Sequence, residues 1–312
     1  MATYLVTGGA GFIGSNIVSE LLARGERVRV LDNFSTGREE NVADRAELVR
    51  GDIRDFDTVD RAVTGVDFVV HQAALASVQR SIDNPSESNQ VNVQGTLNLL
   101  EAARKHKVRR FVYASSSSVY GDSKQLPKVE TMAPNPKSPY AVSKLGGEWY
   151  CRVYSDIFGL PTVSLRYFNV FGPRQDPKSQ YAAVIPIFVR DLLAKRPSTI
   201  FGDGKQSRDF TFVRNVVAAN LLACQANTDG AKVYNVACGE RYDLNQLHAR
   251  LRDLVGVDLA PVHAAPRTGD VKHSQADIGA IERELGFRVE IGFEEGLKRT
   301  VEWYRGSAAA KG

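Results

Sequence analysis

The first two-thirds of this 312-residue sequence alternate short apolar runs with longer segments of helical periodicity. Most of the apolar runs are separated by ten or more residues with a helical pattern. This alternation is typical of a parallel sheet covered by helices on both faces. The sequence therefore predicts an α/β fold with a doubly wound parallel sheet. Its expected strands are residues 3–8, 27–32, 46–52, 66–72, 109–115 and 162–168.

After residue 168 the pattern is less regular. Residues 172–183 and 201–210 have the composition of loops or turns, and residues 233–237 form a strand-like run that could return to the sheet. Helical patterns cover residues 184–195, 213–226, 243–255, 277–285 and 294–304. We therefore expect two domains. The sheet domain would comprise residues 1–168 with a return segment at about 212–237, and a smaller C-terminal α/β domain would comprise residues 169–211 and 238–312.

Composition excludes some functions. The formal net charge is +4, and Lys and Arg are spread along the chain, so no nucleic-acid partner is expected. No apolar run is long enough to cross a bilayer, and the chain enters directly into a strand pattern, so we expect a cytoplasmic protein without a membrane partner. Cys151, Cys224 and Cys238 lack CxxC spacing and nearby His residues. They are expected to be buried thiols, with no metal site.

The segment TGGAGFIG places Gly8, Gly11 and Gly14 between the first strand and the helix that follows. Glycines there let backbone N–H groups approach a pyrophosphate at the helix N-terminus. Asp32 ends the second strand, 18 residues after Gly14, where a carboxylate accepts hydrogen bonds from a ribose and repels a 2′-phosphate. This pattern predicts NAD rather than NADP, although tight turns also use glycine without a ligand. Asp52 could reach the adenine, or it could cap the following helix.

The segment YAVSK puts Tyr140 and Lys144 on one face of a predicted helix at 140–158. A nearby ammonium and an oxidised nicotinamide favour the tyrosine phenolate, which makes Tyr140 a candidate base. A surface pair is the alternative. The run SSSSVYG (115–121) follows the fifth strand at the edge where ligands bind, although serines there also suit a turn. The apolar residues of the opposite helix face are expected to pack, and they are Val142, Leu145, Trp149 and Val153.

Six segments together resemble the extended short-chain dehydrogenase/reductases, and more narrowly the NAD-dependent nucleotide-sugar epimerase/dehydratase group. They are TGGAGFIG, Asp32, SSSSVYG, YAVSK, LRYFNVFGPR and SRDFTFV. The resemblance implies a Rossmann-type sheet domain that binds NAD. It also implies that Tyr140 is the general base, that Lys144 tunes it and holds the nicotinamide ribose, and that Ser116 bonds the sugar hydroxyl. Further positions match the NAD site of that group, namely Phe12, Ile13, Asn33, Ile53, Gln72, Ala73, Ala74, Asn92 and Phe168.

The resemblance also implies a UDP-sugar partner. Arg208 and Arg267 match residues that hold the diphosphate, and Asp270 matches the partner of the uridine ribose. Taken singly, an Arg is more often a surface charge, and it is the coincidence of both with motif positions that favours the site. Other positions match nucleotide-sugar contacts, namely Ser117, Asn169, Ala183, Val184 and Phe201.

Two positions bear on the reaction. The group's 4,6-dehydratases carry an Asp-Glu pair where this sequence has Ser117 and Ser118, so the resemblance implies epimerisation at C4 with NAD regenerated in each turnover. Ser274 matches a position where Tyr restricts the pocket to glucose and galactose and a small residue admits an N-acetyl group. The resemblance thus implies an epimerase of UDP-N-acetylglucosamine and UDP-N-acetylgalactosamine.

Alternatives remain open at this point. One is a UDP-glucose 4-epimerase of relaxed specificity, and another is a UDP-glucuronate epimerase or decarboxylase in which an arginine such as Arg80 meets the carboxylate. A non-catalytic NAD-sensing protein is the alternative outside enzymes, and the presence of Tyr140 and Lys144 argues against it.

A homodimer is also expected, through helices near 88–107 and 140–158. Apolar residues form a stripe on each helix, although core packing would explain the same pattern. They are Val93, Leu97 and Leu100 on the first helix and Trp149 and Val153 on the second.

Overall fold

The computed structural model describes residues 1–177, 183–266 and 272–309. Its centre is a seven-stranded sheet in the order β11-β6-β5-β4-β1-β2-β3, and all neighbouring strands are parallel. The predicted Rossmann-type α/β fold is therefore confirmed. The strands are β1 Thr3–Thr7, β2 Arg27–Asp32, β3 Glu47–Arg50, β4 Phe68–His71, β5 Arg110–Ser116, β6 Thr162–Tyr167 and β11 Ala231–Val236.

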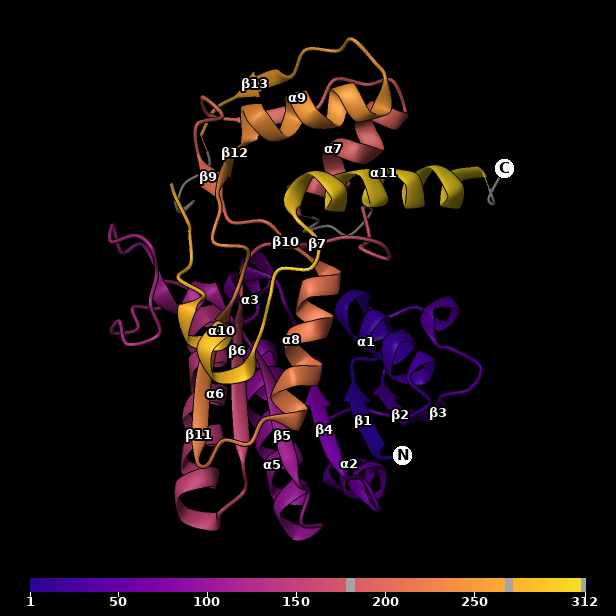
Figure 1. Cartoon of the computed structure of the whole chain (residues 1–312), viewed down its shortest axis with the longest axis vertical. Helices are drawn as coiled ribbons and strands as arrows, with labels where there is room; N and C mark the ends of the chain where they lie inside the picture. The colour runs from indigo at the N-terminus through magenta and orange to yellow at the C-terminus, as the bar shows by residue number, and fades with distance from the viewer. Residues whose placement is uncertain (178–182, 267–271, 310–312) are drawn as a thin grey trace.

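Helices cover both faces of the sheet (Figure 1). Because side chains alternate along a strand, Tyr4 and Val6 of β1 pack on one face while Leu5 packs on the other. The first face is covered by α1 Phe12–Ala23, α8 Val213–Gln225 and α10 Gly279–Leu285. The second face is covered by α2 Phe56–Val63, α5 Gly95–Lys105 and α6 Pro139–Phe158.

The expected helix at 88–107 is divided. It consists of the end of α4 Pro85–Asn89, a π-helical turn η2 Gln90–Gln94 and α5, and α3 Val78–Asp83 precedes it. Leu100 is fully buried in the core of the second sheet face, so the alternative explanation, core packing, holds for this residue. The short 3₁₀ turns are η1 Glu39–Asn41 and η3 Ser117–Tyr120.

The C-terminal helices lie beyond the carboxyl ends of the strands (Figure 1). α7 Val184–Leu193, α9 Leu244–Val255 and α11 Phe293–Ala309 share an apolar core that includes Phe188, Leu247 and Leu297. Part of the predicted loop at 201–210 is extended, because β9 pairs with β12 there. The short strands of this region are β7 Val170–Phe171, β8 Thr199–Phe201, β9 Ser207–Arg208, β10 Thr211–Phe212, β12 Tyr242–Asp243 and β13 Val262–Ala264.

No helix in the described ranges has both the length and the apolar character needed to span a membrane.

Two neighbouring glycines of α6 offer a test of how this helix packs on the sheet. A Cβ on Gly147 would lie 2.2 Å from Oη of the buried Tyr113, whereas a Cβ on Gly146 would lie 3.6 Å from Val93 Cγ2. Gly147→Ala should lower the free energy of unfolding by about 1–3 kcal/mol because the added methyl overlaps the Tyr113 hydroxyl. Gly146→Ala, the matched control, should leave it unchanged or raise it by up to about 1 kcal/mol. Denaturant unfolding measures both, and equal stabilities would contradict this packing.

Candidate functional site

The chain passes from β1 into α1 through a glycine turn, residues 8–14. Gly8 has φ of +67°, in the left-handed region that favours glycine, and its carbonyl accepts the Gly11 N–H at 3.0 Å. The residue before α1 is Gly11, and no side chain caps the helix. The first amides of α1 therefore lack a side-chain acceptor at the carboxyl edge of the sheet, where a helix N-terminus favours an anion.

The three glycines of the motif have different roles. A Cβ on Gly14 would lie 2.2 Å from the Gly8 carbonyl oxygen, and one on Gly8 would lie 2.8 Å from the Ala73 nitrogen. These two glycines are thus required by the packing of the chain itself. A Cβ on Gly11 would meet only the Gly8 carbonyl oxygen, at 3.2 Å, among the described atoms. The space above Gly11 is otherwise open, which fits the close approach of a pyrophosphate to the turn.

Asp32 ends β2 beside this turn. Its carboxylate is buried and accepts the Ala10 N–H at 2.9 Å on one oxygen and the Phe34 N–H at 2.8 Å on the other. Each carboxylate oxygen can accept a further hydrogen bond. The residue is therefore rigidly placed and able to accept the hydroxyls of an adenosine ribose, as NAD requires.

Asp52 lies at the end of β3 in a small polar cluster. Its carboxylate receives two hydrogen bonds from the Arg54 guanidinium, at 2.9 and 2.7 Å, and one from Asn33 Nδ2 at 2.9 Å. The hydrogen bond from Arg54 lowers the pKa of Asp52 to about 2. The cap of α2 is Asp55, so the alternative interpretation of Asp52 as a helix cap is wrong.

The remaining predicted cofactor residues also lie near the carboxyl edge of the sheet. Gln72 Nε2 donates to Tyr167 Oη at 3.0 Å and to Asn220 Oδ1 at 3.1 Å. Asn92 lies in η2, is buried, and donates to Ser143 Oγ at 3.0 Å. The others follow the ends of strands or begin α1, namely Phe12, Ile13, Ile53, Ala73, Ala74 and Phe168.

Tyr140 and Lys144 occupy the first two turns of α6. Lys144 is buried, and its Nζ donates to the Ala114 carbonyl at 2.8 Å and lies 6.0 Å from the centre of the Tyr140 ring. Burial lowers the pKa of Lys144 to about 8, against the opposing effect of the Glu148 carboxylate. Burial raises the pKa of the Tyr140 hydroxyl, and a hydrogen bond with Ser116 opposes this rise. The protein alone thus keeps Tyr140 protonated, and a further positive charge is needed to favour the phenolate.

Ser116 has two roles at the end of β5. Besides its hydrogen bond with Tyr140, its Oγ accepts the Ser118 N–H at 3.2 Å and caps η3. The turn interpretation of the serine run therefore holds for this residue, and its role in the site stays a prediction. Ser117 is partly exposed, and the buried Ser118 Oγ has no hydrogen-bond partner among the described atoms.

A buried ion pair behind Lys144 was missed by the sequence reasoning. Glu148 of α6 and Arg166 of β6 form a bidentate pair at 2.9 and 2.7 Å, and Ser115 Oγ also donates to Glu148. Both charged side chains are only 5–6% exposed. The available signal was a Glu one helical turn after Lys144 together with an Arg inside an apolar strand. The pair fixes α6 against the sheet in the register that carries Tyr140 and Lys144.

Predicted substrate residues line a cavity of about 440 Å³ between β7, α7 and β9. They are Asn169, Ala183, Val184, Phe201 and Arg208. Sequence reasoning missed other residues that line it, including the polar side chains Arg190, Asp191 and Gln206. They lie on a helix and a loop without any recognisable motif, so only the tertiary structure identifies them.

Ser274 lies at the edge of this region. Its Oγ accepts a hydrogen bond from Asn169 Nδ2 at 3.2 Å, and its N–H donates to the Ser207 carbonyl at 3.0 Å. A small side chain therefore stands next to a residue that lines the cavity. Arg267 and Asp270 lie outside the described residues.

Asp209, the neighbour of Arg208 in the SRDF motif, was also missed. It is fully buried, and its carboxylate accepts the N–H groups of Cys238, Gly239 and Ala276 at 3.0–3.1 Å. Burial raises the pKa of Asp209 to about 7, although these amides act in the opposite direction. Asp209 thus joins the strand that carries Arg208 to the segment that follows Ser274.

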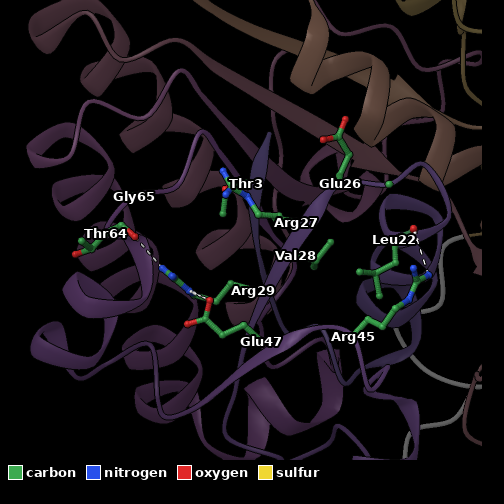
Figure 2. A pocket seen from close by; sticks show the side chains of 11 residues that line it. Thr3, Leu22, Glu26, Arg27, Val28, Arg29, Arg45, Glu47, Thr64 and Gly65 are labelled. Atoms are coloured by element: carbon green, nitrogen blue, oxygen red, sulfur yellow. Dashed lines mark hydrogen bonds and ion pairs between the residues drawn. The ribbon is translucent and has the colours of Figure 1, made fainter. Parts of the chain in front are cut away.

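A second hollow lies at the opposite, amino edge of the sheet. Its volume is about 520 Å³, and it is lined by residues that include Arg27, Arg29, Arg45 and Glu47 (Figure 2). Arg29 pairs with Glu47 at 2.9 Å, and Arg45 donates to the Leu22 carbonyl. Its position away from the carboxyl ends of the strands makes it a weaker candidate for the active site.

Comparison with known proteins finds a match over most of the chain. Residues 4–237 match the NAD dependent epimerase/dehydratase family. The putative UDP-glucose 4-epimerase of Methanocaldococcus jannaschii is 41% identical over 303 residues, covering 96% of this chain and 98% of the relative.

Two solved structures are similar over 98% of this chain and 99% of their own. The UDP-glucose 4-epimerase of Thermotoga maritima with UDP-glucose has a TM-score of 0.95 at 39% identity. The UDP-N-acetylglucosamine 4-epimerase of Methanobrevibacter ruminantium in complex with UDP-N-acetylmuramic acid has a TM-score of 0.94 at 38% identity.

Replacing the buried ammonium should stabilise the fold. Because burial lowers the pKa of Lys144 to about 8 from the ordinary 10.5, the charged form is disfavoured in the folded protein. This destabilisation is fully present below about pH 8 and disappears as the pH rises toward about 10.5. Lys144→Met should therefore unfold with a free energy about 1–3 kcal/mol above that of the cofactor-free wild type near pH 7, and the gain should shrink above about pH 8.

Thermal or denaturant unfolding across this pH range measures the effect. Lys107→Met, at an exposed position, is the control and should show no such gain. A Lys144→Met variant less stable than wild type at about pH 7 would contradict the buried-ammonium argument.

Proposed function

This chain belongs to the NAD dependent epimerase/dehydratase family, and we propose that it interconverts UDP-N-acetylglucosamine and UDP-N-acetylgalactosamine by epimerisation at C4. It is an NAD-dependent UDP-sugar 4-epimerase, in keeping with the relatives that it matches over nearly its whole length. The proposal concerns the identity of the sugar and the residues that act on it.

The proposed mechanism uses Tyr140 as the acid and base. NAD, held by the glycine turn and Asp32, would supply the hydride transfer from and to C4 of the sugar. Tyr140 removes the proton of the C4 hydroxyl and gives it back, and Ser116, which lowers the pKa of the Tyr140 hydroxyl, is proposed to bond the same sugar hydroxyl. The Lys144 ammonium, anchored on the Ala114 carbonyl, supplies positive charge beside Tyr140 and holds the nicotinamide ribose.

The preference for an N-acetyl sugar rests on Ser274. This serine is hydrogen-bonded to Asn169, which lines the cavity, and its side chain is much smaller than the tyrosine ring that would restrict the pocket. An acetamide at C2 of the sugar can use that difference in volume, and pocket volume is an effective determinant of specificity between such substrates. Arg208 and Arg267 are proposed to hold the diphosphate, and Asp270 the uridine ribose.

The alternatives differ in their support. A UDP-glucose 4-epimerase of relaxed specificity is the second candidate, because relatives that this chain matches over nearly its whole length are named UDP-glucose 4-epimerases. For a uronic acid substrate, Arg80 was the proposed partner of the carboxylate, but it already pairs with Glu87 at 2.9 Å. Ser117 and Ser118 cannot provide the acid and base that elimination of water requires. Tyr140 and Lys144 argue against a protein that only senses NAD.

A four-substrate assay tests the activity. Purified protein should interconvert UDP-N-acetylglucosamine and UDP-N-acetylgalactosamine, and Tyr140→Phe should lower kcat by about 100-fold or more because the proton acceptor is lost. Turnover restricted to UDP-glucose and UDP-galactose would disprove the proposed preference. A fully active Tyr140→Phe would disprove the mechanism.

Substitution of Ser274 tests the specificity. Ser274→Tyr should reduce kcat/KM for the N-acetylated pair by about 100-fold relative to the plain hexoses, because the ring overlaps the acetamide. Ser274→Ala is the matched control, since it removes the hydroxyl but keeps the volume, and it should retain turnover of the N-acetylated pair. An equal loss for both sugar pairs in Ser274→Tyr would refute the role of pocket volume.

We also propose a homodimer. Along α6, Val142, Trp149, Val153 and Ile157 are 42–68% exposed and share one face, so the expectation that they pack within the chain is wrong for Val142, Trp149 and Val153. α3 packs beside α6 and carries two further exposed apolar residues, Val78 and Ile82. Exposed apolar patches of this kind mark protein contacts.

A charge in the middle of this surface tests the dimer. Trp149→Glu should give a monomer by light scattering at a concentration where the wild type is dimeric, because the carboxylate would be buried without a partner. Val262→Glu, at a similarly exposed apolar residue on β13, is the control and should leave the mass unchanged. A monomeric wild type would reject the proposal.

A further inference from the structure

His71, the last residue of β4, has no part in the proposed chemistry, yet it is among the most buried titratable groups of the chain. It is 2% exposed and lies between β1 and η2–α5. Its Nδ1 is 2.7 Å from Thr7 Oγ1, and its Nε2 is 2.9 Å from Thr96 Oγ1. Both ring nitrogens thus have one hydroxyl partner each.

The neighbouring hydrogen bonds decide which nitrogen carries the proton. The Thr96 hydroxyl donates to the Asn92 carbonyl at 2.6 Å, so its oxygen accepts the proton of His71 Nε2. Nδ1 is then unprotonated and accepts from the Thr7 hydroxyl. The oxygen of Thr7 in turn accepts the Ala73 N–H at 3.2 Å. The result is one directional chain of hydrogen bonds from Ala73 through Thr7, His71 and Thr96 to Asn92.

The imidazole in this chain is neutral. Burial lowers the pKa of His71 to about 3, and the nearby Lys144 ammonium acts in the same direction. The aromatic rings of Phe111 and Tyr113 pack against it, with ring centres 5.9 and 5.7 Å away. A protonated ring would need a second acceptor where Thr7 now donates, so the neutral form suits the geometry as well.

The two ends of the chain reach the two halves of the site. At one end, Thr7 and Ala73 adjoin Gly8, which packs against Ala73 in the glycine turn. At the other end, Asn92 Nδ2 donates to Ser143 Oγ at 3.0 Å, and the Ser143 hydroxyl donates to the Tyr140 carbonyl at 2.8 Å. The path therefore runs from the cofactor turn to the first turn of α6.

We infer that His71 is a positioning residue, a neutral imidazole with its proton on Nε2 that couples the glycine turn to the first turn of α6. The inference rests on the proposed function for its effect on turnover, but not for its effect on the tautomer or on cofactor binding. Its consequence is that a change on the cofactor side of the ring reaches Tyr140 and Lys144, and a change on the helix side reaches the cofactor.

A double-mutant cycle on the holoenzyme tests the coupling. Thr7→Val and Thr96→Val each remove one hydroxyl at nearly constant volume, and each should lower kcat by about 10-fold and weaken retention of NAD. The double variant should lose about 10-fold rather than the 100-fold product, because both substitutions break the same chain. Multiplicative losses would mean independent structural roles and would overturn the inference. Thr7→Ser and Thr96→Ser keep the hydroxyls, and each should have a kcat within about threefold of the wild-type value.

The tautomer is tested without turnover. In protein with ¹⁵N-labelled histidines, the resonances lost in His71→Asn should show an unprotonated Nδ1 and a protonated Nε2 at every pH from about 6 to 9. The ring ¹⁵N resonances of His106, which is partly exposed and lies 2.9 Å from Asp60, provide an internal comparison for those of His71. A proton on Nδ1, or titration of His71 in this range, would overturn the inference. A wild type that epimerises no UDP-sugar would refute the proposed function while leaving the NMR and NAD-retention results to decide the role of His71.

Discussion

The parallel direction of all seven strands is the constraint on which the rest of this structure depends. Parallel strands end at one edge, so the glycine turn after β1, Asp32 at the end of β2 and Ser116 at the end of β5 meet there, although more than 100 residues separate Gly8 from Ser116. The order of strands reverses between β1 and β4, which is the position where open parallel sheets bind ligands. The C-terminal helices lie beyond the same edge (Figure 1), where α7 lines the cavity proposed to hold the substrate.

The site is built from buried charges, each held by a compensating partner. The Lys144 ammonium donates a hydrogen bond to the Ala114 carbonyl and is stabilised by the negative charge of Glu148. Glu148 in turn forms an ion pair with Arg166. Asp209 relies on three backbone amides. Buried charges of this kind destabilise the fold without such partners. Their clustering around Tyr140 and Arg208 is typical of a functional site, where residues are retained at a cost in folding stability.

Local patterns predicted the sheet and the main helices well, because hydrophobic periodicity is a property of consecutive residues. The same reasoning failed for strands of two or three residues such as β9 and β12, which are too short to show a period. The alternative role of Asp52 as a helix cap was wrong, because its carboxylate pairs with Arg54, and so was the expected packing of the exposed face of α6. Leu100 and Trp149 are both apolar, yet Leu100 is buried in the core and Trp149 is exposed at the surface.

By itself the sequence determined the fold class, the glycine turn, and the Tyr140–Lys144 spacing on one helix face, since each depends on residues close together in the chain. Only the tertiary structure decided which distant groups meet: Glu148 with Arg166, Asp209 with the amides of Cys238 and Ala276, Ser274 with Asn169, and His71 between Thr7 and Thr96. The physical reason is that burial and hydrogen-bond partners are set by packing between elements, which sequence spacing does not record.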